Sequence, residues 1–175
     1  MSRPVLALLL LISSILCTLL SCTAPSQGQT LAQVESEHPE IIIAISYFNE
    51  TLGGQVEALQ AAHETLTIFA PENTAIRALP QGALANLERN HTLLQDVLLY
   101  HMLHGNYTAR DLEERGAFRP KTLFDNNTVL IEANASGVTV NGYEVVTPDV
   151  FFDLGVIHII DGVLIPPEFR SDLLG

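Results

Sequence analysis

The chain has 175 residues, a formal net charge of −12 at pH 7 and a mean hydropathy of +0.27. An acidic surface repels nucleic-acid phosphates and anionic membranes, which argues against both as partners. The two cysteines, Cys17 and Cys22, lie near the N-terminus. We therefore expect no disulfide framework in the rest of the chain, where about 145 residues suffice for one hydrophobic core.

Residues 1–24 are typical of a secretory signal peptide. Arg3 precedes an apolar stretch from Val5 to Leu20, and small residues that follow offer cleavage sites. The stretch is shorter than the ~20 residues that a membrane-spanning helix needs. A second interpretation stays open, because Leu19-Leu20-Ser21-Cys22 matches a bacterial lipobox in which Cys22 would carry a lipid anchor.

An excess of N-x-Ser/Thr sequons favours a eukaryotic secretory route with N-glycosylation. The chain has nine asparagines, of which chance would place about one or two in sequons. The five sequons are at Asn49, Asn90, Asn106, Asn126 and Asn134. Residues 169–175 form a short tail without the apolar segment of a glycosylphosphatidylinositol signal, so we expect a secreted, extracellular protein without that anchor.

The first half of the remaining chain is predicted to be mainly helical. Residues 31–64 follow a helical pattern in which Pro39 suits the first turn of a second helix. Gly53-Gly54 predicts an interruption before a further helical segment at 56–62.

A short strand and further helices are expected next. Leu66–Phe69 predicts a strand that Pro71 ends, and Asn73 is the expected N-cap of the following helix. Helical residues resume near 82–87, and Thr92 with Gln95 forms a capping box. Gly105 is the expected end of that helix, which has these residues on one face: Leu94, Val97, Leu98 and His101.

The C-terminal half is predicted to be β-structure. A strand is expected at 128–132, and Asn141-Gly142 suits a type I′ hairpin turn within 138–146. Residues 156–165 are apolar on both alternate faces, which indicates a buried strand, with Asp161-Gly162 as a bulge or bend. The fold class is therefore α+β, with N-terminal helices packed on a mixed β-sandwich or partial-barrel wedge.

Three blocks in this order resemble the fasciclin (FAS1) domain family. Thr67–Ile76 is similar to the family's first conserved box, Gly155–Pro167 to its second, and Tyr100-His101 to its Tyr-His pair. The resemblance covers about residues 30–168. It implies one compact domain with a sheet wedge flanked by helices, in a short secreted member of fungal type.

Tyr100 and His101 are the candidate binding residues, because the resemblance associates this pair with adhesion. The alternative, which we favour, is structural: His101 faces the core and bonds the backbone, while Tyr100 anchors neighbouring loops. His101 and His104 have a spacing that two metal ligands could use, but no third ligand accompanies them, so no metal site is predicted.

Catalytic chemistry is not expected either. The acidic residues near the histidines are interpreted as a solvated helix face and a helix start: Asp96, Asp111, Glu113 and Glu114. No nucleophile elbow, phosphate loop or dinucleotide fingerprint occurs, so we expect no enzyme and no cofactor.

Two functions remain. The first is a secreted binding module that contacts extracellular or cell-wall glycoproteins or polysaccharide in adhesion. The second is an auxiliary protein that helps a secreted multicopper oxidase of laccase type to couple aromatic polyketides during pigment or toxin biosynthesis. It would act by orienting substrates and not by chemistry of its own. The residues alone do not separate the two.

Overall fold

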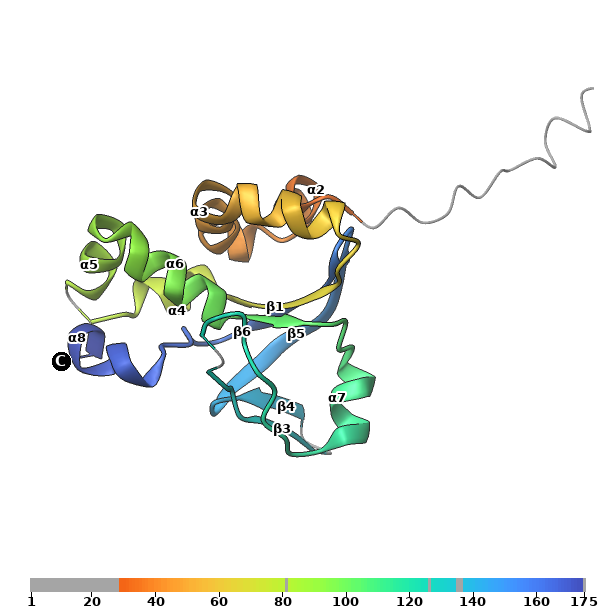
Figure 1. Cartoon of the computed structure of the whole chain (residues 1–175). Helices are drawn as coiled ribbons and strands as arrows, with labels where there is room; N and C mark the ends of the chain where they lie inside the picture. Colours follow the sequence, from red (N-terminus) through yellow and green to blue (C-terminus); the bar gives the residue numbers. More distant parts are fainter. Residues whose placement is uncertain (1–28, 81, 126, 135–136, 175) are drawn as a thin grey trace, which may run out of the picture.

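The computed structural model describes residues 29–80, 82–125, 127–134 and 137–174 (Figure 1). In this part of the chain, six strands form one mixed sheet in the order β2-β1-β6-β5-β4-β3. The strands are β1 (Leu66–Pro71), β2 (Met102–His104), β3 (Ile131–Asn134), β4 (Gly137–Val140), β5 (Tyr143–Phe152) and β6 (Gly155–Ile160).

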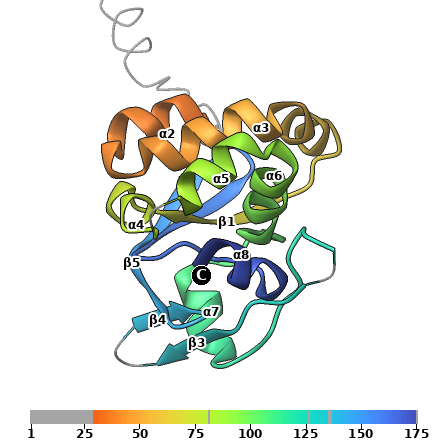
Figure 2. The same cartoon turned by 90° about the vertical axis from the view of Figure 1, so that its left-hand side faces the viewer.

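Helices lie on both sides of the central strands. Figure 2 shows α2, α3, α5 and α6 on one side, and α7 together with β3 and β4 on the other. The helical segments are α2 (Leu31–Glu37), η1 (Pro39–Ile41), α3 (Ile42–Ala61), α4 (Asn73–Arg77), α5 (Ala83–Arg89), α6 (His91–Tyr100), α7 (Ala109–Arg115), η2 (Pro167–Phe169) and α8 (Arg170–Leu174).

Two apolar clusters follow from this arrangement. One, which includes Phe48 and Ile157, lies between the sheet and the N-terminal helices. The other, which includes Phe69 and Leu112, lies where the sheet curls towards α7. The predicted α+β class is confirmed, and the sheet takes the partial-barrel form.

The parallel pair β1 and β6 is the centre of the fold. Leu66 pairs with Gly155 and the register continues to Pro71 and Ile160, so the two predicted strands lie side by side. A Cβ at Gly155 would lie 2.1 Å from the carbonyl oxygen of Leu66, so glycine is required where the two backbones meet. β6 ends at Ile160, and the following two residues form the expected bend.

The predicted hairpin is also confirmed. Asn141 and Gly142 have φ values of 51° and 88°, both positive as a type I′ turn requires, and they join β4 to β5. β3 begins at Ile131, three residues later than predicted. The preceding residues instead make single bridges, such as Lys121 with Thr128.

Two helix-start predictions were wrong. The Asn73 side chain does not cap its own helix. Its Oδ1 accepts from the Ile43 N–H at 3.1 Å and its Nδ2 donates to the Pro39 carbonyl at 2.8 Å, which secures the start of α3. α6 begins at His91, where the Asn90 side chain accepts from the Leu93 N–H at 3.2 Å, so the Thr92 capping box does not form.

Two helix-end predictions were also wrong. α3 continues through Gly53-Gly54, because Val56 and Leu59 beyond the glycines still pack against the helical cluster, and this contact outweighs the ~1 kcal/mol that each glycine costs a helix. α6 ends at Tyr100 and not at Gly105, because Met102–His104 pair with β1 as an edge strand.

The segment after the last strand is folded as well. The expected tail, 169–175, contains α8, which packs near α5 and buries Leu173 in the helical cluster. Across the described ranges, no helix is both long and apolar enough to span a membrane.

Candidate functional site

Tyr100 lies at the end of α6 and joins three parts of the chain. Its side chain is only 1% exposed. The hydroxyl donates to the Thr128 carbonyl at 3.1 Å and accepts from Nδ2 of Asn141, also at 3.1 Å. Because Asn141 belongs to the hairpin turn, this hydroxyl holds the turn and the residues before β3 against α6.

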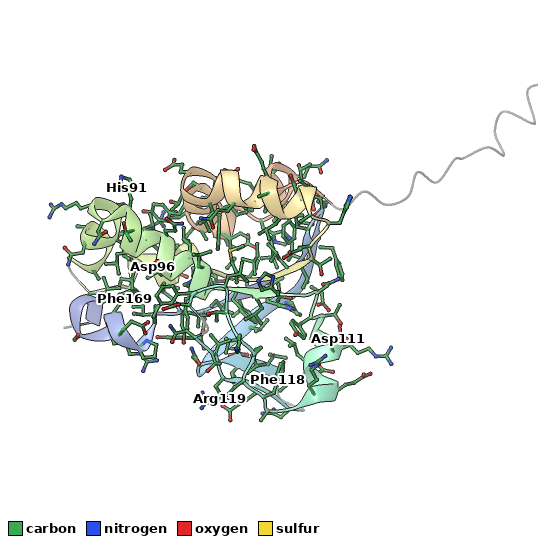
Figure 3. The ribbon with its side chains drawn as sticks, in the orientation of Figure 1. His91, Asp96, Asp111, Phe118, Arg119 and Phe169 are labelled. Carbon is green, nitrogen blue, oxygen red and sulfur yellow. The ribbon has the colours of Figure 1, made fainter. Side chains whose placement is uncertain are left out.

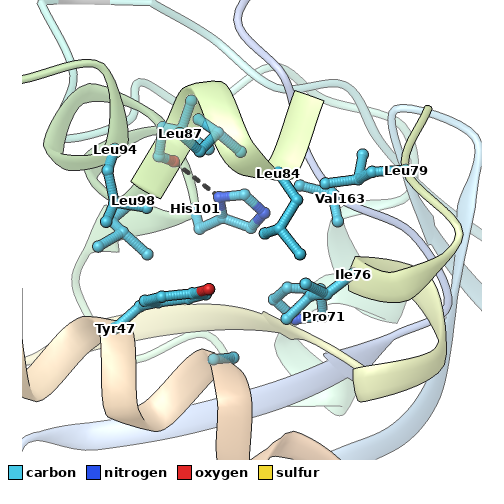
Figure 4. A pocket seen from close by; sticks show the side chains of 12 residues that line it. Tyr47, Pro71, Ile76, Leu79, Leu84, Leu87, Leu94, Leu98, His101 and Val163 are labelled. Atoms are coloured by element: carbon cyan, nitrogen blue, oxygen red, sulfur yellow. Dashed lines mark hydrogen bonds between the residues drawn. The ribbon is translucent and has the colours of Figure 1, made fainter. Parts of the chain in front are cut away.

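His101 is similarly buried, at 2% exposure. The Leu164 N–H donates to its Nε2 at 2.9 Å, so that nitrogen is unprotonated, and Nδ1 donates to the Val97 carbonyl at 2.7 Å, the dashed line in Figure 4. Burial lowers the pKa of His101 to about 4, so the ring is neutral at physiological pH.

A second buried histidine, His158, has the opposite tautomer. The Asp149 N–H donates to its Nδ1 at 3.3 Å, and Nε2 donates to the Tyr107 carbonyl at 2.7 Å. Its ring stacks on Phe69 with 5.7 Å between centroids. Burial lowers the pKa of His158 as well, so this ring is also neutral.

The loop around Asn106 is held on both sides. The Tyr107 N–H donates to Oγ1 of Thr67 at 2.9 Å, and that hydroxyl donates to the Gly105 carbonyl at 2.8 Å. Together with the bond from His158, these contacts fix the backbone that presents the exposed Asn106 side chain.

The candidate metal and acid residues do not converge. Both ring nitrogens of His101 and of His158 are occupied by backbone groups, while His104 is exposed and pairs with Glu64 at 3.2 Å. The described residues contain no group of three or more ligating side chains that could hold a metal ion.

Two of the candidate carboxylates lie on different helices. Asp111 forms a capping box with Thr108 at the start of α7, and these hydrogen bonds keep its pKa below the ordinary value. Asp96 is on α6, where partial burial raises its pKa. Figure 3 shows them on opposite sides of the molecule, so they cannot act as an acid–base pair.

An apolar pocket lies beside His101, between α3, α5 and α6 and the segment that contains α4. The space that it encloses is small, about 30 Å³. Its walls include Leu84, Leu87, Leu94 and Leu98, with Tyr47 on the α3 side (Figure 4). This pocket could not be predicted from the sequence, because its lining comes from segments as far apart in the chain as Ala44 and Val163.

A shallow groove runs along the outer edge of β5; we call it the β5 groove. It is lined by Gln29, His38 and Thr147 to Phe151. Along this edge, β5 pairs with β4 only at Tyr143 and Glu144, and with Gln29 only at Phe152, within the described residues. Phe151 is 52% exposed there, the largest exposed fraction among the large apolar side chains described.

Four of the five sequon asparagines are exposed: Asn49, Asn90, Asn106 and Asn134. Asn126, the predicted signal at 1–24 and the alternative anchor Cys22 lie outside the described residues. Asn90 also caps α6 through Oδ1, which leaves Nδ2, the atom that a glycan would modify, without a part in the cap.

The fasciclin domain model matches residues 43–166. The chain belongs to the fasciclin domain family. The match contains both central strands, β1 and β6, and the Tyr100-His101 pair. Family members are mostly extracellular modules, generally adhesive and non-catalytic.

Its similarity extends to bacterial and animal proteins. It is 31% identical over 151 residues to protein sll1483 of Synechocystis sp., which covers 81% of this chain and 82% of that protein. Human periostin is 35% identical over 106 residues, which is 60% of this chain but 12% of periostin. Immunogenic protein MPB70 of Mycobacterium bovis is 24% identical over 151 residues, 83% of this chain and 76% of MPB70.

A solved structure supports the fold. The FAS1 domain pair of the insect cell adhesion molecule fasciclin I superimposes with a TM-score of 0.62 at 20% identity, over 73% of this chain and 46% of that chain. At this identity the likeness concerns the fold alone.

Proposed function

We propose that this chain is a secreted, non-catalytic binding module that contacts extracellular or cell-wall glycoproteins or polysaccharide through the outer edge of β5. The observation that carries the proposal is the distribution of exposed apolar side chains. Of the four large ones among the described residues, Tyr143, Val146 and Phe151 lie on β5, and Ile42 is the fourth. Apolar surface gathered on one element is typical of interaction sites.

The surroundings of this edge favour a partner with positive charge. Asp149 lines the β5 groove, and Asp153 follows the end of β5. The whole chain has 20 acidic and 8 basic residues. A cationic segment that carries an apolar side chain would meet complementary charge at the rim and apolar contact at Phe151.

Tyr100 and His101 support adhesion indirectly in this proposal. Both are buried and bonded to the backbone of other segments, so a partner cannot touch them unless the fold opens. A substitution there would reduce binding through loss of structure. Family-type adhesion and a buried Tyr-His pair are therefore compatible.

The test compares two apolar side chains with the same exposure. Val146 and Ile42 are each 42% exposed, but only Val146 lies on β5. We expect V146S and F151S to fold normally and to lose most retention of the partner in adhesion and pull-down assays, while I42S behaves as the wild type. Equal retention by all three variants would contradict the proposal.

The partner itself is identified by affinity capture of the glycosylated protein from native secretions, followed by mass spectrometry. Wall or matrix glycoproteins or polysaccharide, lost with F151S, would support the adhesion role. Recovery of a multicopper oxidase instead would favour the auxiliary role in oxidative coupling.

A further inference from the structure

We infer that a pocket at the start of α8 binds a small organic anion, which has one carboxylate attached to an apolar body of about the size of a single ring. We call it the Arg170 pocket. It encloses about 230 Å³, against about 30 Å³ in the pocket beside His101. A cavity of roughly 150 Å³ is enough to hold benzene. The lining residues are Asn141, Tyr143, Val163, Leu164, Ile165 and Arg170.

Three segments that are distant in the chain form this pocket. The hairpin of β4 and β5 supplies Asn141 and Tyr143, the irregular segment after β6 supplies the three aliphatic residues, and α8 supplies Arg170. Figure 1 shows the chain running from β6 to α8 at one end of the sheet. The Arg170 pocket shares no lining residue with the β5 groove.

The ring of Tyr143 has a fixed place in the wall. A Cβ at Gly162 would lie 1.9 Å from Cδ1 of Tyr143, so the ring lies directly against this glycine. Oδ1 of Asp161 accepts a hydrogen bond from the Glu144 N–H at 2.7 Å, which holds the bend after β6 to the start of β5. Part of the Tyr143 side chain is still exposed and offers an aromatic surface to a ligand.

The charged side chain of the lining is a cation. No lining residue is acidic, and no ion pair within the described residues engages Arg170. By contrast, Arg110 pairs with Glu114 at 2.9 Å, and Arg115 lies over the ring of Tyr107. A guanidinium binds a carboxylate through two parallel hydrogen bonds, so Arg170 suits a ligand with such a group.

The backbone of the lining adds hydrogen-bond donors. The Leu164 N–H donates to Nε2 of His101 at 2.9 Å, but within the described residues the N–H groups of Val163 and Ile165 form no hydrogen bond. Both residues are buried, and buried N–H groups in proteins are normally paired. A carboxylate in the pocket supplies acceptor oxygens for donors of this kind.

Other classes of ligand fit these groups less well. An uncharged hydrocarbon leaves the guanidinium of Arg170 and the two N–H groups without acceptors, and a cation is repelled by Arg170. The whole chain has 20 acidic and 8 basic residues, so it repels a ligand with several negative charges. A single carboxylate beside an apolar body uses the guanidinium, the N–H donors and the ring of Tyr143 together.

The experiment titrates the folded protein with benzoate at neutral pH and follows amide chemical shifts by NMR. We expect saturable shifts at Tyr143, Val163 and Ile165. Acetate, which has the carboxylate without the ring, and benzyl alcohol, which has the ring without the charge, should each bind at least tenfold more weakly. Equal binding of either compound, or the absence of saturable shifts with benzoate, would overturn the inference.

Matched arginine variants provide the control. R170Q and R119Q each remove one exposed positive charge, but only Arg170 lines the pocket. R170Q should weaken benzoate binding at least tenfold, whereas R119Q should leave it unchanged, and equal losses would contradict the inference. If circular dichroism shows that R170Q is unfolded, Y143L decides. It keeps the guanidinium and should abolish the preference for benzoate over acetate, and a preference that persists would count against the pocket.

This inference and the proposed adhesive function can fail separately. Tyr143 belongs to both surfaces, so other residues distinguish them. F151S changes the β5 groove and should bind benzoate as the wild type does. R170Q should retain the adhesion partner as the wild type does. Loss of benzoate binding in F151S would contradict the assignment of the ligand to the Arg170 pocket.

Discussion

The two buried histidines use the same chemistry in different surroundings. His101 and His158 are both neutral, and each joins a backbone N–H of one segment to a carbonyl of another. The hydrogen bonds of His101 are fully buried, whereas those of His158 are only partly buried, and its partner Asp149 lies on the wall of the β5 groove. Equal hydrogen bonding therefore does not imply equal tolerance to change. What differs is whether water can reach the backbone groups that the ring would leave behind.

The largest expected effect tests this difference directly. H101L leaves the Val97 carbonyl and the Leu164 N–H buried without partners, so we expect a loss of about 4 kcal/mol in the free energy of unfolding. H158L should cost about 2 kcal/mol, because the Asp149 backbone lies at the wall of the β5 groove, where water can bond the freed N–H. Urea unfolding measures both, with H104L as a control near zero since His104 is exposed. Equal losses at the two buried sites would remove the distinction.

Acid should destabilise the protein through both histidines. The unfolded chain protonates His101 near its ordinary pKa of 6.5, whereas the folded chain keeps it neutral down to about 4. The stability present above pH 6.5 is therefore lost as the pH falls, by about 2 kcal/mol from this residue between pH 7 and 5.

The measurement is the free energy of unfolding at several pH values in this interval. The non-titrating H101N variant should show a flatter dependence than the wild type. The remaining slope should come partly from His158, whose pKa is also lowered by burial. An unchanged slope in H101N would show that His101 does not stay neutral on folding.

The hydroxyl of Tyr100 should have a smaller effect. Y100F leaves the Thr128 carbonyl and the Asn141 amide without this partner, and we expect a loss of about 1–2 kcal/mol. Partner binding by the folded variant should match the wild type when both are measured well below their unfolding temperatures. Loss of binding by a fully folded Y100F would instead give Tyr100 a direct contact.

The smallest effect concerns the helix that carries His101. In protein made without glycans, N90A removes the cap of α6 and should cost about 1 kcal/mol, while T92V should change stability by less than about 0.5 kcal/mol. In glycosylated protein both variants would also abolish the same sequon, so T92V would separate loss of the glycan from loss of the cap. Hydrogen exchange should show lower protection in α6 and unchanged protection in β6. A spread of the effect to β6 would mean that the two histidine regions are coupled.

Local chemistry explains which parts of the fold could be predicted. The turn at Asn141-Gly142 and the buried β1 and β6 strands depend on φ preference and on apolar pattern over a few residues. Helix ends were harder to predict. Asn73 has the side chain of an N-cap, but it bonds α3, about thirty residues away in the chain. Propensity alone cannot tell which helix a side chain will cap.

The candidate site also has features that the sequence predicted and features that it did not. The exposure of the sequons at Asn49, Asn90, Asn106 and Asn134 agrees with their polar surroundings in the sequence. The groove along β5 lies beyond the predicted hairpin, 138–146, because β5 continues to Phe152 and carries further apolar residues there. Their exposure depends on the bulges in the pairing with β6 and on the unpaired outer edge.

The sequence by itself determined the family, the α+β class and the two central strands. The blocks that resemble the family and the apolar periodicity of the strands each depend on residues close together in the chain. Only the tertiary structure decided the tautomers of His101 and His158, the pocket between the helices and the open edge of β5. Each of these depends on which backbone group, side chain or solvent a residue meets across long separations in the chain. Such contacts are set by packing, to which local propensity contributes little.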